Sequence, residues 1–335
     1  MLRRGRLAAT LAALGVVAAL AGCETSALAP RTSGVKPQAR PATLAPAPAP
    51  QPAAMPAQPA APEPSAASQA LAQYYARVQN DLLARGLLRT DGGGPDTAFT
   101  DTMLVRNFAA IALEEEYVRG EGLRPSGGAA SAIKKWLQPV RMTVEFGPRV
   151  PEDQHAFDRA QVSSFAARLA RVTGHPITMT DSDPNFHVLF MSEDDSDRIA
   201  PRIQQIVPDV NPSALRIFNN LPRSIHCLVV AFSDTPGGYS YGTAIAVIRS
   251  EHPELLRRSC IHEEVAQGMG LGNDDPRARP SIFNDDDEFA LLTTHDEMLL
   301  KILYDPRLTP GMRAEQALPI VQARAAELTG SDGPS

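Results

Sequence analysis

The sequence lacks the features by which several common classes of protein are recognised. It has no long stripe of lysine and arginine, and its formal net charge is −6, which argues against a nucleic-acid-binding protein. Its three cysteines include no C-x-x-C pair, so neither a zinc ribbon nor a thioredoxin motif is present. No serine lies in a G-x-S-x-G context, and the GGG at 92–94 lacks the Lys-Ser/Thr of a phosphate loop. The remaining composition, 43% hydrophobic and 21% charged, is typical of a soluble globular protein.

Residues 1–22 have the pattern of a secretory signal peptide. A basic start precedes an apolar run at 7–20 that is too short for a stable transmembrane helix. The run ends in Leu-Ala-Gly-Cys at 20–23, which resembles the lipobox of bacterial lipoproteins. This resemblance implies cleavage before Cys23, acylation of that cysteine and anchoring to a membrane by its acyl chains. Glu24, in place of aspartate, favours the outer membrane, and the alternative is a plain secretory signal with a chance cysteine.

The rest of the chain divides by composition into four parts. Residues 23–66 hold 11 of the 30 prolines, which predicts an extended, disordered tether. Apolar residues at helical spacing predict two amphipathic helices within 67–131, a helical lead-in. Strands and helices mix over 132–325, and 326–335 is expected to be a disordered tail.

The mixed segment predicts an α+β fold with a small mixed sheet packed on helices. Helices are expected at 151–174 and 254–269, and a last one within 291–308. The acidic run at 193–197 predicts a loop or the start of a helix. Alternating or β-branched runs predict strands at 140–147, 177–180, 186–191, 226–233 and 241–250, with a hairpin or a crossover between the last two.

Two cysteines remain in the mature chain, Cys227 and Cys260. In an oxidising envelope compartment, two such thiols favour one disulfide. The alternative is two buried free cysteines, because the sequence does not give their distance.

The segment SCIHEEVAQGMGLGND (259–274) contains His262-Glu263, the first half of the zinc-protease signature H-E-x-x-H, but Ala266 stands where the second histidine belongs. A different register fits better. If Gly270 is the glycine of the longer signature H-E-x-x-H-x-x-G-x-x-H, the first histidine position carries Glu263 and the catalytic glutamate position carries Glu264. The second and third histidine positions then carry Gln267 and Asn273.

In this register the order of elements over 138–308 resembles the metzincin class of zincin-type metallopeptidases. Phe283, in PSIFND (280–285), takes the place of the methionine of the Met-turn, and 291–308 resembles the last helix of these proteases. A capping box over Thr294–Glu297 is expected to start that helix. The strand at 241–248 takes the place of the family's substrate-aligning edge strand. More narrowly, EEVAQGMGLGND and LYDPRLTPGM resemble a family of bacterial envelope domains of unknown function, grouped with those peptidases.

The resemblance implies a zinc site, but the residues present carry only oxygen ligands in place of imidazoles. Three interpretations stay open. Glu263, Gln267 and Asn273 form a polar cluster, or the cleft binds peptide, glycan or a hard cation without turnover, or a rearranged site uses Glu264 as base. In the last case His262 or His295 is the partner.

The sequence therefore predicts a lipid-anchored envelope protein that faces the periplasm from the outer membrane and has a degenerate zincin-like domain. We expect non-catalytic binding or scaffolding, with a working hydrolase that uses Glu264 as the alternative. No metal is expected beyond weak Ca²⁺ or Mg²⁺ binding, to which the acidic residues at 274–275 and 284–289 could contribute. The expected partners are the membrane and a peptide, glycan or envelope protein, and not nucleic acid.

Overall fold

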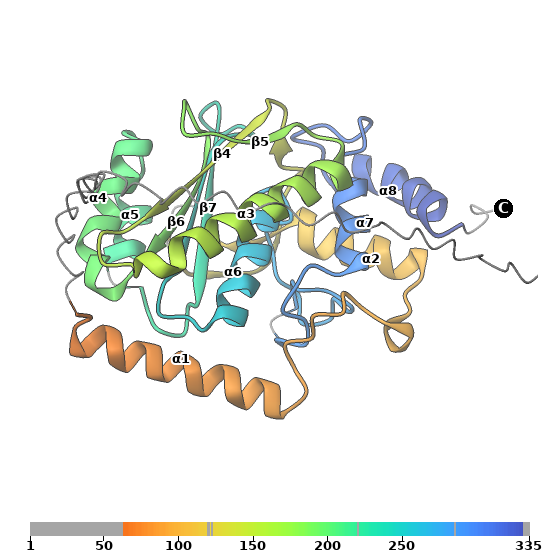
Figure 1. The fold of residues 1–335 in the computed structure, drawn as a ribbon. Helices are drawn as coiled ribbons and strands as arrows, with labels where there is room; N and C mark the ends of the chain where they lie inside the picture. The colour runs from red at the N-terminus through yellow and green to blue at the C-terminus, as the bar shows by residue number, and fades with distance from the viewer. Residues whose placement is uncertain (1–62, 119–120, 122, 220, 285, 331–335) are drawn as a thin grey trace, which may run out of the picture. The chain divides into compact units, whose positions relative to one another are not determined.

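A computed structural model describes residues 63–118, 121, 123–219, 221–284 and 286–330, all within one compact unit. The expected signal peptide, Cys23 and nearly all of the tether lie outside these residues. The main sheet has the order β3-β8-β6-β4-β5, and β7 pairs with the other side of β8 (Figure 1). Its strands are β3 (Lys135–Trp136), β4 (Val140–Phe146), β5 (Ile177–Met179), β6 (Phe186–Met191), β7 (Cys227–Ser233) and β8 (Ser240–Arg249). Only the β7–β8 pair is antiparallel, so the sheet is mostly parallel.

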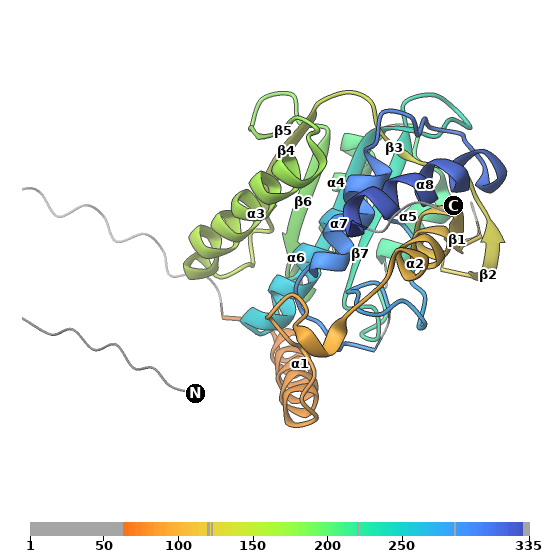
Figure 2. The same cartoon turned by 90° about the vertical axis from the view of Figure 1, so that its right-hand side faces the viewer.

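Helices cover both faces of this sheet, as the period-2 side-chain alternation requires. In β6, Phe186, Val188 and Phe190 join the main core, whereas Leu189 and Met191 join a second cluster on the opposite face. Figures 1 and 2 show α3 and α6 on the main-core face, with α4 and α5 on the other. The helices are α3 (Glu152–Thr173), α4 (Ser196–Ile206), α5 (Pro212–Asn219), α6 (Glu254–Gln267), α7 (Thr294–Leu303) and α8 (Ala314–Thr329).

The first two helices differ in how they attach to this core. Helix α2 (Asp101–Leu113) places Leu104, Phe108 and Ile111 inside the main core, so the expected boundary at residue 132 falls within one hydrophobic cluster. Helix α1 (Ala66–Ala84) packs instead in a smaller cluster that includes Leu256 at the start of α6. Only α1 therefore behaves as a helix added to the outside of the domain.

Most predicted elements are confirmed, and their ends have local causes. Helix α3 stops at Gly174, which has φ +68° and closes the helix in the left-handed conformation. Helix α7 does begin with a capping box, but one residue earlier than expected. Thr293 is the N-cap and Asp296 reaches back to its N–H, so the prediction of Thr294 and Glu297 was wrong by one position. The acidic run at 193–197 is a 3₁₀ turn (Glu193–Asp195) that leads into α4.

The sequence prediction was wrong about the edge of the sheet. The strand at 241–248 is β8, which pairs with β7 on one side and with β6 and β3 on the other, so it is interior. The edge strand next to β8 is β7, and β5 lies at the opposite edge. Because β7 and β8 are antiparallel neighbours, the turn between them makes a hairpin and no crossover.

Other elements were not predicted. Helix α2 ends at Leu113, and the glutamates after it form β1 (Glu114–Tyr117), paired with β2 (Pro125–Ala130). Helix α5 was also missed, whereas the start of α4 lies within the acidic run where a loop or a helix start was expected. Helix α8, which follows the expected last helix, was missed too; it contains Pro319 and is capped by Gly330. A short 3₁₀ turn (Pro95–Thr97) precedes α2. None of the helices in the described ranges is both long and apolar enough to cross a membrane.

Candidate functional site

A cavity of about 590 Å³ lies between the edge strand β7 and helix α6. All seven residues of β7 line it on one side, and α6 contributes Ser259, Glu263, Glu264 and Gln267 on another. Strand β1 with Lys134, and Gly272, Asp274 and Ile282 after α6, complete the wall. The predicted cleft beside Glu264 is therefore present.

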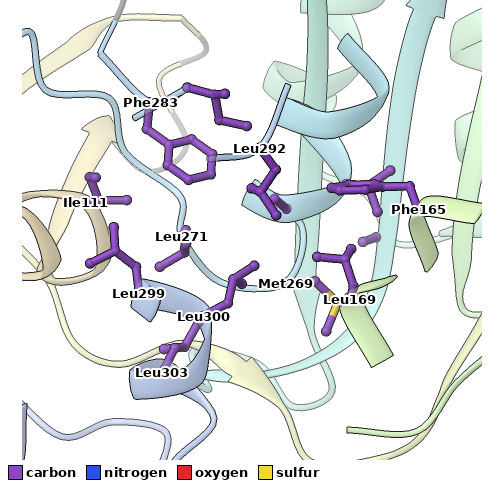
Figure 3. Packing of buried hydrophobic residues seen from close by; sticks show 14 of the residues in the cluster. Ile111, Phe165, Leu169, Met269, Leu271, Phe283, Leu292, Leu299, Leu300 and Leu303 are labelled. Carbon is purple, nitrogen blue, oxygen red and sulfur yellow. The ribbon is translucent and has the colours of Figure 1, made fainter. Parts of the chain in front are cut away.

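Helix α6 directs part of its side chains to the cavity. Cys260, Glu264 and Gln267 are separated by four and three residues, so they lie above one another on the helix. Ile261 and Val265, on the opposite face, are fully buried in the main core. This core continues beneath the site through Met269, Leu271 and Phe283 (Figure 3). Phe283, the expected Met-turn equivalent, is fully buried there in the main core.

The chain leaves α6 at the glycine on which the register was based. Gly270 has φ +124°, a conformation that side chains rarely adopt. A Cβ there would also collide with the backbone carbonyl oxygen of Lys134. Both facts require glycine at position 270. After this turn the chain returns to the cavity wall at Gly272 and Asp274.

Glu264 connects the helix to the edge strand. The residue is 4% exposed, and its carboxyl group accepts a hydrogen bond from the backbone N–H of Val229 in β7. One carboxyl oxygen, Oε2, is buried and has no hydrogen-bond partner among the described residues. Since Val229 directs its N–H to α6, alternation along the strand directs the backbone groups of Ala231 to the same side.

The surroundings of Glu264 disfavour its charged form. Burial is the main cause that raises its pKa well above the ordinary value, and the charges of Asp274 and Glu116 add to it. The Val229 hydrogen bond acts in the opposite direction. Burial, followed by a hydrogen bond with Glu116, also raises the pKa of Tyr117. The cavity thus gathers acidic groups from three segments of the chain.

The three predicted ligand positions do not converge. Glu263 and Gln267 line the cavity, and the Gln267 amide nitrogen donates to Asp274 Oδ1 at 3.1 Å. Asn273 is turned away, because its amide nitrogen donates to the carbonyl oxygen of Ala110 in α2 at 2.8 Å. The polar cluster at this site is therefore Glu263, Glu264, Gln267 and Asp274, with Asp274 in the place expected for Asn273.

The two histidines considered as catalytic partners are structural. His262 accepts a hydrogen bond from the Leu292 N–H at 3.0 Å and stacks on Phe165 with 4.0 Å between ring centroids. Burial lowers the pKa of His262 to about 3, so it is neutral at physiological pH. His295 is fully buried, and its ring lies against the Asn107 amide nitrogen, 3.0 Å away. Neither histidine lines the cavity.

The predicted disulfide is confirmed. Cys227 of β7 and Cys260 of α6 are bonded to each other. Cys260 precedes Glu264 by one helical turn, and Cys227 precedes Val229 by two strand positions. The disulfide and the Glu264–Val229 hydrogen bond therefore join the same helix and the same strand at successive positions.

The residues present do not fit the zinc ion that the resemblance implies. In the described part of the chain, one group of potential ligand atoms lies within 4.8 Å of one another, from Cys227, Glu263 and Glu264. The Cys227 sulfur belongs to the disulfide, so it provides no thiolate. Two carboxyl groups without imidazole or thiolate are a poor zinc site.

Some cavity residues were missed from the sequence. Glu116 and Tyr117 were assigned to the end of a helix, and no local signal marks them, since glutamate favours helices. The carboxyl group of Glu115, the residue before them, accepts a hydrogen bond from Lys134 Nζ at 2.5 Å. Among the described residues, six with carboxyl groups and one lysine line the cavity.

Comparison with known proteins gives a family and no function. Residues 101–323, more than half of the chain, match the model of the family described as "Protein of unknown function (DUF2927)". The chain belongs to this family. No curated protein matches it, and no solved structure does.

Proposed function

We propose that this protein is a lipid-anchored protein of the bacterial cell envelope whose cleft binds an extended peptide segment without cleaving it. The anchor is the acylated Cys23, and the proline-rich tether lets the domain reach partners away from the outer membrane, on its periplasmic side. The proposal keeps the zincin-like interpretation of the fold, in which an edge strand aligns a peptide beside a helix.

The observation that carries the proposal is the edge strand β7, which lines the cavity along its whole length. In the described part of the chain, β7 pairs only with β8. Its outward backbone groups at Ala231 are therefore available to a strand from another molecule. Strand addition of this kind binds a peptide by main-chain hydrogen bonds, and the cavity then receives alternate side chains.

The state of Glu264 supports binding without catalysis. A general base must reach the proton that it abstracts, and its carboxylate must be charged to do so. Glu264 accepts the Val229 N–H, is buried and has a raised pKa. The ligand atoms that converge beside Glu264 in the described part of the chain include no imidazole or thiolate, which is a poor site for a zinc ion that would activate water.

The test uses purified full-length protein and blocked heptapeptides that alternate Thr and Val around a variable central residue. We expect binding, which Ala231→Pro weakens because proline removes the outward N–H while β7 keeps its pairing with β8. Ala231→Gly retains that N–H and is the matched control. Equal affinities for the two variants, or binding by neither variant nor wild type, would contradict strand addition.

The alternative is an envelope hydrolase that uses Glu264. The raised pKa of Glu264 favours it, because strongly shifted pKa values in clefts often mark catalytic groups. The same peptides decide this point by mass spectrometry after long incubation, with elemental analysis of protein purified without chelators. Intact peptides and no stoichiometric metal support binding alone. Cleavage that Glu264→Gln abolishes would establish the hydrolase.

A further inference from the structure

The charge of the cavity restricts what it can bind. Among the described residues that line it, Lys134 is the only lysine or arginine, and its Nζ donates a hydrogen bond to the Glu115 carboxyl group. Burial lowers the pKa of His226, so this histidine adds no positive charge at neutral pH. Acidic groups therefore dominate the cavity, and a ligand that carries positive charge is favoured over a neutral or negative one.

One buried atom of this cavity has no hydrogen-bond partner among the described residues, and it can accept one from a cation, which favours the charged form of Glu264. Glu264 Oε2 is buried without a partner, while Val229 donates to the same carboxyl group. The Gln267 amide nitrogen donates to Asp274 Oδ1. Buried polar atoms in native proteins nearly always have a partner, so an unsatisfied atom in a cavity indicates where a ligand donates.

We propose that the peptide bound in this cleft carries a lysine or arginine side chain whose charged group donates to Glu264 Oε2, beside Glu116 and Asp274. This inference rests on the proposed function and adds a specificity to it. An ammonium has three donors and a guanidinium five, and their charge offsets the repulsion among the carboxyl groups. A neutral donor would satisfy Oε2 but leave that repulsion in place.

A divalent cation fits the cavity less well. Ca²⁺ takes six to eight oxygen ligands, and Mg²⁺ requires nearly octahedral geometry. In the described part of the chain, the donor atoms that lie within 4.8 Å of one another comprise two carboxyl oxygens and the Cys227 sulfur. A flexible side chain with several donors does not need such convergence.

The experiment compares four of the blocked Thr/Val heptapeptides, with lysine, arginine, norleucine or glutamate at the central position. Their affinities for the full-length protein are measured by titration calorimetry. We expect the lysine and arginine peptides to bind at least about tenfold more tightly than the norleucine peptide, and the glutamate peptide most weakly. Glu264→Gln retains an oxygen to accept the Val229 N–H and removes most of this preference. Asp274→Asn gives a smaller reduction.

The control Glu315→Gln removes the same charge from the exposed first turn of α8, which does not line the cavity, and leaves the preference unchanged. Thermal unfolding verifies that each variant is folded. Equal binding of all four peptides would overturn the charge preference while strand addition stands, and binding of none would overturn both. A preference that survives both cavity substitutions would also overturn the inference. So would stoichiometric Ca²⁺ binding that excludes the lysine peptide.

Discussion

Carboxyl groups are buried in two different ways in this protein. In the core, Asp296 is fully buried and accepts four hydrogen bonds from neighbouring hydroxyl and amide groups. Asp158 is also fully buried, and the Arg257 Nε lies 2.7 and 2.8 Å from its two oxygens. In the cleft, Glu264 has one donor and faces two further carboxyl groups.

This difference separates the residues that hold the fold from those left for a ligand. A buried charge stabilises a fold only if the protein supplies partners for it, as it does for Asp158 and Asp296. A buried carboxyl group with too few hydrogen-bond partners lowers the stability of the fold. Proteins keep such groups at functional sites, where a bound ligand provides the missing partners. The comparison yields four predictions about stability, which differ in size.

The largest effect is expected from Arg257→Leu, which leaves Asp158 buried without its cation. Burial already raises the pKa of Asp158 with Arg257 in place. Breaking such a pair costs about 3–5 kcal/mol of the free energy of unfolding, measured by guanidinium denaturation. The double variant Arg257→Leu/Asp158→Leu should recover most of this loss. A single variant as stable as the wild type would show that the ion pair does not hold the core.

The disulfide gives the next effect, because it fixes the two walls of the cleft. Replacing both Cys227 and Cys260 by alanine frees a loop with a sequence separation of 33 residues. Such a loss typically costs about 2–4 kcal/mol of unfolding free energy. Wild-type protein treated with a dithiol reductant should unfold at the same denaturant concentration as the double variant. If the reduced protein is as stable as the oxidised one, the walls are held by packing alone.

Glu264→Gln should raise the free energy of unfolding, whereas the core substitutions lower it. The pKa of Glu264 is raised in the folded state, so folding retains a proton that the unfolded chain releases above pH 4.5. Glu264 therefore destabilises the fold increasingly as pH rises through this window, by up to about 1.4 kcal/mol per pH unit. Urea denaturation at pH 4, 6 and 8 should show the glutamine variant gaining stability relative to wild type. If the difference in unfolding free energy between the two proteins does not change with pH, Glu264 resembles the fully hydrogen-bonded carboxyl groups of the core.

The strands and helices that the sequence predicted correctly are those with strong local signals. Alternation identified β4, a short apolar run identified β6, and Gly174 identified the end of α3. The end of α2 was missed, because three glutamates after Leu113 continue a helical pattern, and only pairing with 125–130 turns them into a strand. The interior place of β8 depends on pairing with distant strands, which no local pattern encodes.

The site was predicted in part for the same reason. Glu263, Glu264 and Gln267 lie on one helix, so their spacing determines their shared direction. Asn273 and Asp274 follow the helix exit, where the direction of each side chain depends on contacts with other segments. Asn273 is held by Ala110 and Asp274 by Gln267. Spacing alone does not distinguish these two neighbours.

Asn273→Ala gives the smallest effect and tests this distinction. The substitution removes one buried hydrogen bond to the carbonyl oxygen of Ala110, which costs about 1 kcal/mol of unfolding free energy. Because Asn273 does not line the cavity, affinity for the lysine heptapeptide should stay at its wild-type value. Gln267 lines the cavity, so Gln267→Ala, which removes the hydrogen bond to Asp274 Oδ1, should change that affinity. If instead Asn273→Ala weakens binding of the peptide and Gln267→Ala does not, the cleft is organised around Asn273, the position that the longer protease signature implied.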